Sequence, residues 1–216
     1  MEEVLEVYHR PHDPQRPVGC CDASSKPLVK ATRTPIPAAA GRPATSDDEY
    51  ARHGTAHLCM MCEPLGGQRR VVVTERRTAT DDAHAVRHVV DERYRHAEKI
   101  VWVQDHLTPH PPASLYDAFP PEEARRLIEQ LEVHSTPKHG SWLNMAETEL
   151  RILSRQCLDR RLPDRATLTA EVAAWERDRN AAQCCVDWQC TTTEARVKLK
   201  RLYPVLQPVN SGVLEH

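Results

Sequence analysis

Residues 101–110 read VWVQDHLTPH, an apolar run that ends on Asp105 and is followed by two histidines. The run begins at Ile100, and its nearly unbroken apolar character is typical of a strand covered on both faces of a sheet. An aspartate in this place either opens a turn or lies at the end of the strand, where α/β clefts form. The stretch PVGCCD (17–22) repeats the pattern and ends on Asp22. Both aspartates are therefore candidates for a site at one edge of a sheet.

The composition is that of an ordinary globular chain. The 216 residues are 40% hydrophobic and 28% charged, with a formal net charge of -2, which is typical of one soluble domain around one core. No apolar stretch approaches the roughly 20 residues that cross a bilayer, and the N-terminal MEEVLEVYHR lacks the basic-then-apolar order of a signal peptide. We therefore predict a cytoplasmic protein.

The order of elements predicts a mixed α/β sheet. Hydrophobic periodicity and turn residues predict strands over 17–22, 55–65, 68–75, 99–105 and 132–137, and helices over 80–94, 120–131, 142–157, 164–175 and 191–203. This alternation favours a five-stranded sheet with helices on both faces. The segment 23–54 contains too many breakers for regular structure beyond a short hairpin, so we expect a long irregular insertion there.

Common nucleotide-binding and hydrolase motifs are not found in the sequence. Its seven glycines form neither GxGxxG nor GxxxxGK, and GxSxG does not occur, which argues against dinucleotide sites, phosphate-binding loops and serine-nucleophile turns. Carboxylates at the ends of predicted elements remain. They are Asp22 and Asp105 after two strands, and Glu147 in the first turns of the helix that GSWLNMAETEL begins.

Three carboxylates in one place would form a site for hard cations. If the strand ending at Asp22 is central, the strand ending at Asp105 lies beside it. Carboxylates brought together raise each other's pKa unless a cation is present, and oxygen ligands suit Mg²⁺ or Mn²⁺. Two such ions can activate the attacking oxygen and stabilise the leaving one in phosphoryl transfer. Each residue also has a simpler interpretation: a turn residue for either aspartate, and a capping-box partner of Asn144 for Glu147.

Cys59 and Cys62 form a CxxC, with His53 and His57 close by in sequence. A zinc module built on these residues is one hypothesis for the function. No second CxxC or histidine pair stands at the spacing of a zinc finger. The surrounding run is strand-like, which favours buried and reduced thiols.

Basic residues gather in several places along the chain. Runs of this kind are solvated faces in most proteins and bind phosphate in the others. The candidates for phosphate contacts are Arg69, Arg70, Arg76, Arg77, Lys138, Arg151, Arg155, Lys198, Lys200 and Arg201.

Four segments carry a resemblance to a known family: VQDHLTPH, TPKHGSWLNMAE, SRQCLDRRLPD and ARVKLKRLYP. From about residue 4 to Pro204 the chain resembles the catalytic domain of bacterial insertion-sequence transposases of the DDE superfamily, in the group related to mariner elements. The resemblance implies an RNase H-like fold and a reaction in which divalent metal ions support DNA strand cleavage and strand transfer. Water would attack the phosphodiester first, and the released 3′ hydroxyl would then attack target DNA.

The family's three catalytic carboxylates fall on Asp22, Asp105 and Glu147. The resemblance implies that Asp22 bridges two Mg²⁺ or Mn²⁺ ions and that Asp105 and Glu147 each hold one. It also places His106, His110 and Asn144 next to these ligands. The sequence departs from the family pattern at Ala23, where a glutamate is usual, and at His106, where an asparagine is usual.

The resemblance also predicts domains and partners. We expect a catalytic domain over residues 1–204 and a flexible tail over 205–216, without the helix-turn-helix module that precedes this domain in the family. The expected partners are transposon ends and target DNA, held mainly through phosphates, with self-association or a separately encoded helix-turn-helix half. Such a bacterial protein would lie in the cytoplasm at the nucleoid. The alternative is a truncated, catalytically impaired relic that binds DNA or an intact transposase without cutting.

Overall fold

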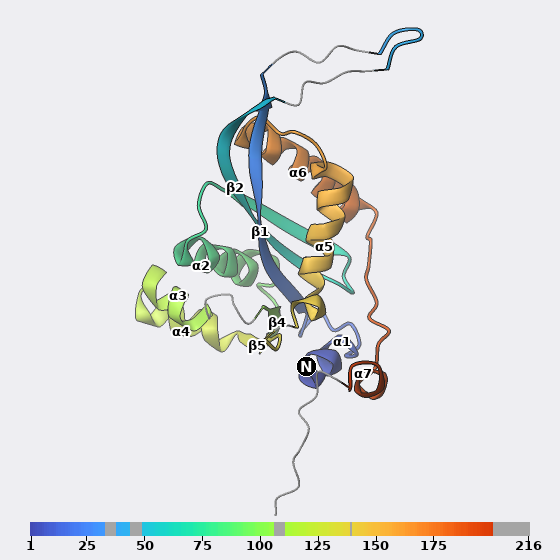
Figure 1. The fold of residues 1–216 in the computed structure, drawn as a ribbon. Coiled ribbons are helices and arrows are strands. Elements are labelled where there is room, and N and C mark those ends of the chain that lie inside the picture. The colour runs from blue at the N-terminus through green and yellow to red at the C-terminus, as the bar shows by residue number, and fades with distance from the viewer. Residues whose placement is uncertain (33–37, 44–48, 106–110, 139, 201–216) are drawn as a thin grey trace, which may run out of the picture.

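A computed structural model describes residues 1–32, 38–43, 49–105, 111–138 and 140–200 (Figure 1). Its strands are β1 (Val18–Ala31), β2 (Tyr50–Glu63), β3 (Gln68–Thr74), β4 (Ile100–Gln104) and β5 (Leu131–Ser135). Its α-helices are α1 (Glu2–Tyr8), α2 (Ala79–His88), α3 (Pro111–Ala118), α4 (Pro121–Glu129), α5 (Met145–Leu153), α6 (Arg165–Ala181) and α7 (Thr192–Lys198). Shorter turns are η1 (Val89–Arg93) and η3 (Ser154–Leu158), which are π-helical, and η2 (Ser141–Leu143), which is 3₁₀. In this part of the chain, no helix combines the length and apolarity that crossing a membrane requires.

The strands form one mixed sheet with the order β3-β2-β1-β4-β5. β1 is central: it pairs antiparallel with β2 and parallel with β4. The parallel register places Cys21 opposite Gln104, the last residue of β4. The predicted five-stranded sheet is therefore confirmed, and so is the prediction that the strands carrying Asp22 and Asp105 are neighbours.

The prediction of an irregular insertion over 23–54 is wrong in large part. β1 continues to Ala31 and β2 begins at Tyr50, so the two strands form a long antiparallel ribbon beyond the rest of the sheet (Figure 1). Pro27 looked like a strand breaker, but it lies where the register of the ribbon shifts, a place where a missing backbone donor is tolerated. The other edge of the ribbon is partly satisfied, because the Val29 N–H donates to the Leu162 carbonyl at 2.7 Å.

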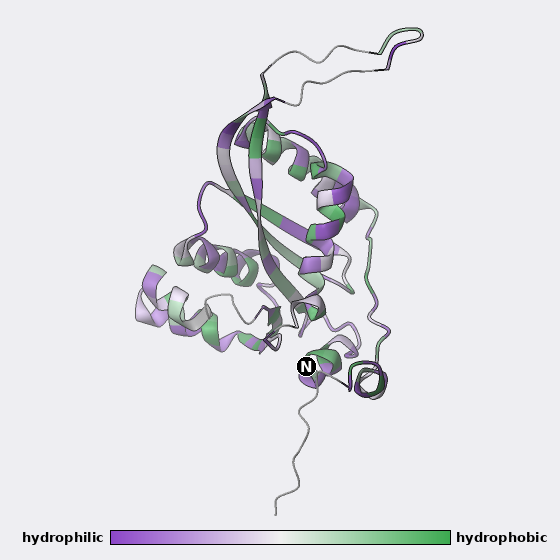
Figure 2. Ribbon diagram, viewed as in Figure 1, coloured by the Kyte–Doolittle hydropathy of each residue, from purple (hydrophilic) through white to green (hydrophobic). Residues whose placement is uncertain are grey.

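Helices cover both faces of the sheet, as the sequence predicted. One face packs against α1, α5 and α6, where Leu5, Leu153 and Leu168 are buried. The other packs against α2, α3 and α4, where Val86, Leu115 and Leu127 are buried. Hydrophobic residues run through the strands between the two helical layers, whereas the helices mix hydrophobic and hydrophilic residues (Figure 2). Each helix buries its apolar face against the sheet. This packing fixes the position of α5 across β1 and β2.

Some helix ends differ from the sequence expectation. The helix expected from residue 80 begins earlier, because the Thr78 side chain forms a reciprocal capping box with Asp81 at the start of α2. The helix expected from residue 164 does begin there, since the Asp164 side chain accepts from the Thr167 N–H at the start of α6. The helices α1 and α3 were not predicted. Periodicity indicates the apolar face of a helix, but it carries no signal for the hydrogen bonds that end it.

Candidate active site

Asp22, Asp105 and Glu147 line one pocket of about 480 Å³. Asp22 comes from β1, Asp105 directly follows β4, and Glu147 lies in the first turn of α5. The parallel register of β1 and β4 brings the two aspartates to the same end of neighbouring strands. The structure thus gathers the three predicted carboxylates from three elements that are far apart in the sequence. Their role as metal ligands stays a prediction.

The ionised form of the Asp22 carboxyl group is disfavoured in this pocket. Burial raises its pKa from the ordinary 3.8 to about 6, and the negative charges of Asp105 and Glu147 add to the rise. A hydrogen bond from the Ala23 N–H and the positive charge of Arg77 act in the opposite direction. Because Asp22 lies inside β1 and pairs with Met60 of β2, the turn interpretation of this residue is wrong. A cation in the pocket would stabilise the ionised form of Asp22.

Asp105 is held in place by a buried side chain from the next strand segment. The Thr136 hydroxyl, which follows β5 and is fully buried, donates to Asp105 Oδ1 at 2.8 Å. Thr136 was not among the predicted site residues, because the contact depends on the pairing of β4 with β5. The predicted neighbours His106 and His110 lie outside the described residues.

Glu147 has one paired and one unpaired oxygen. Its Oε1 accepts from Arg151 Nη2 at 2.6 Å, one helical turn further along α5. Its Oε2 is buried and has no hydrogen-bond partner, which normally costs free energy. The capping-box interpretation of Glu147 is wrong, because its carboxylate pairs with Arg151 and does not reach back to the backbone of Asn144.

Asn144 links α5, which carries Glu147, to β1, which carries Asp22. Its Oδ1 caps α5 by accepting from the Ala146 N–H, and its Nδ2 donates to the Cys21 carbonyl at 2.8 Å. The fully buried amide therefore fixes the start of α5 against the residue before Asp22. Asn144 is thus next to the carboxylates, where the resemblance placed it.

Tyr8 supports the same junction, and the sequence analysis missed it. Its hydroxyl donates to the Leu143 carbonyl at 2.8 Å and accepts from the Met145 N–H at 3.3 Å. The signal for α1 was present in EVLEVY, where Val4, Leu5, Val7 and Tyr8 are buried. Nothing in that pattern indicates the contact with residues 143 and 145.

Asn144→Ala is expected to lower the free energy of unfolding by about 2 kcal/mol, because a helix cap is lost and a buried carbonyl loses its donor. Urea denaturation would measure the change. Asn144→Asp is the companion variant, since it keeps the capping oxygen, loses the donor to Cys21 and adds a negative charge next to the carboxylates, so it should also be destabilised. Wild-type stability in Asn144→Ala would show that neither bond holds α5 in place.

The pocket suits divalent cations by its ligand chemistry. All three converging groups are carboxylates, which are preferred by Mg²⁺ and Mn²⁺, and the buried Glu147 Oε2 lacks a partner. Within the described residues, no three His, Cys, Asp or Glu side chains are arranged to hold a single ion. That arrangement is compatible with two ions that each take one or two carboxylates and complete their shells with water, as Mg²⁺ usually does.

The zinc hypothesis is contradicted by the structure. Cys59 contacts Cys21 on the face covered by α2, with 3.8 Å between the sulfurs, whereas Cys62 lies in the core on the α5 face. Because adjacent positions of a strand alternate between faces, the CxxC spacing separates the two thiols. The described part of the chain also offers no group of three ligands, and a zinc site needs three or four around one ion.

Two of the predicted phosphate contacts line the carboxylate pocket. Arg151 and Arg155 lie one turn apart on α5 and η3, and both are exposed. Arg77 acts on Asp22 through its charge. Arg70, Arg76, Lys138, Lys198 and Lys200 are exposed elsewhere on the surface, and Arg201 lies outside the described residues.

Arg69 does not belong with these residues, and the prediction that it contacts phosphate is wrong. Its side chain is 1% exposed and forms a two-pronged ion pair with Glu149 of α5, with Nε–Oε2 2.7 Å and Nη2–Oε1 2.8 Å. Asn180 of α6 also bonds the N–H and the carbonyl of Arg69. This buried cluster joins β3 and α6 to α5, two residues after Glu147. The signal for it was a glutamate on the apolar face of α5, which requires a cation.

A family model described as DDE superfamily endonuclease matches residues 17–169. No curated protein matches the chain. Among solved structures, the Mos1 strand transfer complex aligns with a TM-score of 0.55 and 14% identity, over 85% of this chain and 54% of that chain. A simian T-cell lymphotropic virus intasome in complex with PP2A regulatory subunit B56 gamma aligns with a TM-score of 0.41 and 10% identity, over 99% of this chain and 67% of that one.

The likeness to the Mos1 complex is a likeness of fold. With the strand order β3-β2-β1-β4-β5 and helices on both faces, it confirms the RNase H-like fold that the sequence resemblance implied. This chain spans about half the length of the Mos1 chain that it matches.

Proposed function

The chain belongs to the DDE superfamily endonucleases, and on that premise we propose that it cleaves and rejoins DNA strands with the help of divalent metal ions. Asp22, Asp105 and Glu147 are the proposed catalytic carboxylates. The observation that carries the proposal is their convergence on one pocket from β1, β4 and α5. An acid cluster of this kind costs stability in the absence of cations, as the raised pKa of Asp22 indicates, so a function is the best explanation for it.

Asp22 is the proposed shared ligand of two ions, because both other carboxylates act on it electrostatically. Asp105 and Glu147 would each hold one of the two. Thr136 keeps Asp105 oriented through its hydroxyl, and Asn144 holds Glu147 near Asp22. When bound, Mg²⁺ or Mn²⁺ supplies Lewis-acid stabilisation of the charge on the phosphoryl group and activation of the attacking oxygen.

Arg151 and Arg155 are the proposed contacts to the substrate backbone. Their guanidinium groups flank the pocket, and such groups form strong charge-assisted hydrogen bonds with phosphate oxygens. Contacts with phosphate groups do not distinguish one base sequence from another. We therefore expect DNA binding that falls steeply with salt and shows little sequence preference.

A more specific proposal also starts from membership of the DDE superfamily endonucleases. We propose that residues 1–204 are the catalytic domain of an insertion-sequence transposase that performs strand transfer on transposon ends and target DNA. Two copies, or this chain with a helix-turn-helix partner, would assemble on DNA. An electrophoretic mobility assay with and without a terminal-repeat sequence would distinguish specific from general binding.

The test of the proposal is nicking of supercoiled plasmid DNA in Mn²⁺. The wild-type protein should nick, chelation of the metal should stop it, and Asp105→Asn should reduce the rate by more than about 100-fold, since even residues that only support metal ligands cost 10- to 100-fold. Asp117→Asn, an exposed aspartate in α3, is the matched control and should nick normally. Equal rates for Asp105→Asn and wild type would rule out the proposed site.

A second candidate function is DNA binding without cleavage. It is favoured by Ala23, which lines the same pocket without a side-chain ligand where the family usually has a glutamate. Calorimetry separates the two candidates. Retained DNA binding with no heat of Mg²⁺ or Mn²⁺ binding would favour the non-cleaving protein.

A further inference from the structure

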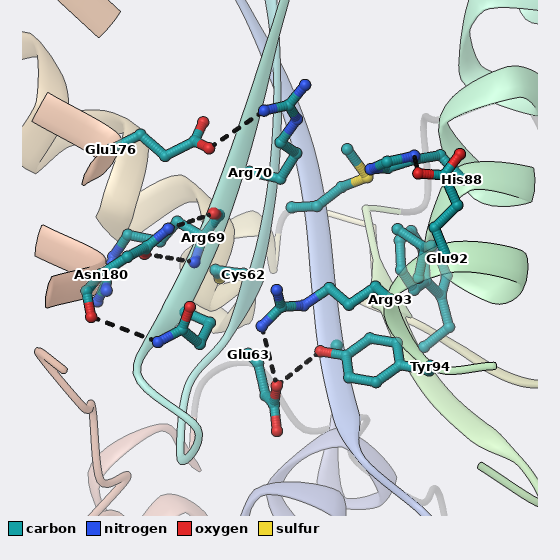
Figure 3. Close-up of a pocket in the computed structure, with 15 residues that line it drawn as sticks. Cys62, Glu63, Arg69, Arg70, His88, Glu92, Arg93, Tyr94, Glu176 and Asn180 are labelled. Carbon is teal, nitrogen blue, oxygen red and sulfur yellow. Dashed lines mark hydrogen bonds and ion pairs between the residues drawn. The ribbon is translucent and has the colours of Figure 1, made fainter. Parts of the chain in front are cut away.

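A second pocket, of about 370 Å³, lies between the β2–β3 hairpin and η1 (Figure 3). It shares no lining residue with the carboxylate pocket. Gly19, Met61, Val89 and Trp102 contribute apolar surface to it, and charged side chains from β2, β3, η1 and α6 complete the lining. An apolar surface with a few converging polar groups is the usual make-up of a small-molecule site.

The carboxylates of this pocket are already well supplied with donors. Glu63, which is 8% exposed, accepts from the Tyr94 hydroxyl at 2.8 Å and faces Arg93 at 3.5 Å and His12 at 3.3 Å. Glu176 accepts from the Val71 N–H at 2.8 Å and faces Arg70. Glu92 pairs with His88 at 3.0 Å. The acceptor capacity of Glu63 and Glu176 is therefore partly used within the protein, whereas the Glu92 side chain is 70% exposed.

The guanidinium groups of Arg93 and Arg70, by contrast, use few of their hydrogen-bond donors within the protein. Arg93 extends into the pocket (Figure 3), its side chain is 32% exposed, and within the described residues its guanidinium contacts Glu63 at 3.5 Å and the Tyr94 side chain. In the same part of the chain, Arg70 bonds Glu176 at 3.4 Å. A guanidinium has five N–H donors in a planar fork, so both groups retain most of their capacity. Arg93 also lies over the Tyr94 ring at 5.3 Å, which holds the fork in place.

The backbone that carries Arg93 is itself unusual. Val89, Glu92 and Arg93 belong to the π-helical turn η1, which follows α2 directly. Turns of this type are rare and occur frequently at functional sites, because the extra residue redirects side chains. Here the turn brings one apolar and two charged side chains to the same pocket.

We propose that this pocket binds a small organic anion, with a carboxylate or phosphate oxyanion on the donors of Arg93 that its partners leave unused and an apolar body against Met61 and Val89. Both oxyanions match the fork of a guanidinium in a two-pronged geometry. Glu63 and Glu176 do not prevent this, since Glu63 contacts Arg93 and the Tyr94 hydroxyl and Glu176 contacts Arg70. The site is separate from the carboxylate pocket and does not depend on the proposed nuclease function.

The test follows the Trp102 indole N–H in ¹H–¹⁵N spectra of the full chain, with the signal assigned through Trp102→Phe. Butyl phosphate and butyrate are the two probes, because they share the apolar body, and the one that binds more tightly identifies the oxyanion. A saturable shift is expected in wild type and in Arg125→Gln, an exposed arginine of α4 outside the pocket. Arg93→Gln should weaken the affinity about tenfold or more, as the loss of a charge-assisted hydrogen bond does.

Arg93→Lys guards against an effect of misfolding, because it keeps the charge and removes only the fork. A dispersed, wild-type-like spectrum with weakened binding supports the proposal. Absence of a saturable shift with either probe overturns it, and so does equal affinity of wild type and Arg93→Gln. A short DNA duplex that shifts the Trp102 signal when neither probe does also overturns it, and would make Arg93 and Arg70 part of a DNA-contacting surface.

Discussion

Asp22→Asn is expected to stabilise the metal-free protein by about 1–2 kcal/mol at neutral pH while it removes the stabilisation by Mg²⁺ or Mn²⁺. The pKa of Asp22 is raised from 3.8 to about 6 by burial and by the charges of Asp105 and Glu147. A full conversion of that shift would give about 3 kcal/mol, and partial exposure to solvent reduces the figure. Asparagine removes the charge and keeps the shape of the side chain.

The stabilisation should depend on pH in a defined direction. Because the pKa of Asp22 is higher in the folded than in the unfolded protein, the unfolded state releases its proton first as the pH rises. Metal-free wild type should therefore lose stability relative to Asp22→Asn between the ordinary pKa of 3.8 and slightly above the folded value of about 6. Below this range both side chains are neutral, and the two proteins should differ little.

Urea denaturation across this pH range, with and without Mg²⁺, measures both effects. Ligand binding to the folded state stabilises wild type by about 2.7 kcal/mol at a metal concentration of 100 times Kd, and Asp22→Asn should show almost none of that gain. Asp117→Asn serves again as the exposed control. If metal stabilised Asp22→Asn as much as wild type, Asp22 would not be a ligand.

Glu149→Ala is expected to lower the free energy of unfolding by about 3–5 kcal/mol, the usual result of removing one partner from a buried ion pair. The Arg69 and Glu149 side chains are 1% and 2% exposed, and Arg179 also contacts Glu149 at 3.3 Å. Without the carboxylate, the Arg69 guanidinium remains buried, and the acceptors left to it within the described residues are the carbonyls of Gly67 and Cys184. Urea denaturation measures the loss.

Glu129→Ala is the matched control for this prediction, because Glu129 pairs with Arg125 on the surface of α4 and such pairs contribute little. The double variant Arg69→Met with Glu149→Leu should recover much of the loss, since well-packed apolar residues often replace a buried ion pair at no cost. A non-additive recovery would show that the two residues act as a pair. If Glu149→Ala were as stable as Glu129→Ala, the cluster would not hold α5.

Local patterns in the sequence were sufficient to predict that five strands form the sheet, but not the full lengths of β1 and β2. The apolar run before Asp105 predicted β4, and the apolar runs over 55–65 and 68–75 predicted most of β2 and β3, because these signals depend on neighbouring residues. The resemblance to a known family then singled out Asp22, Asp105 and Glu147, and the structure places all three on one pocket. Spacing alone had left the turn and capping interpretations open.

Only the tertiary structure decided what depends on contacts between distant residues. Arg69 looked like a surface arginine until the fold placed it against Glu149, and residues 23–31 looked irregular until β2 supplied their hydrogen bonds. Thr136 and Tyr8 gave no sign in the sequence that they orient Asp105 and the start of α5. The sequence by itself determined which residues alternate, which faces are apolar and where charges lie. Which charge is buried and which is left for a ligand follows from packing, because burial is a property of the whole chain.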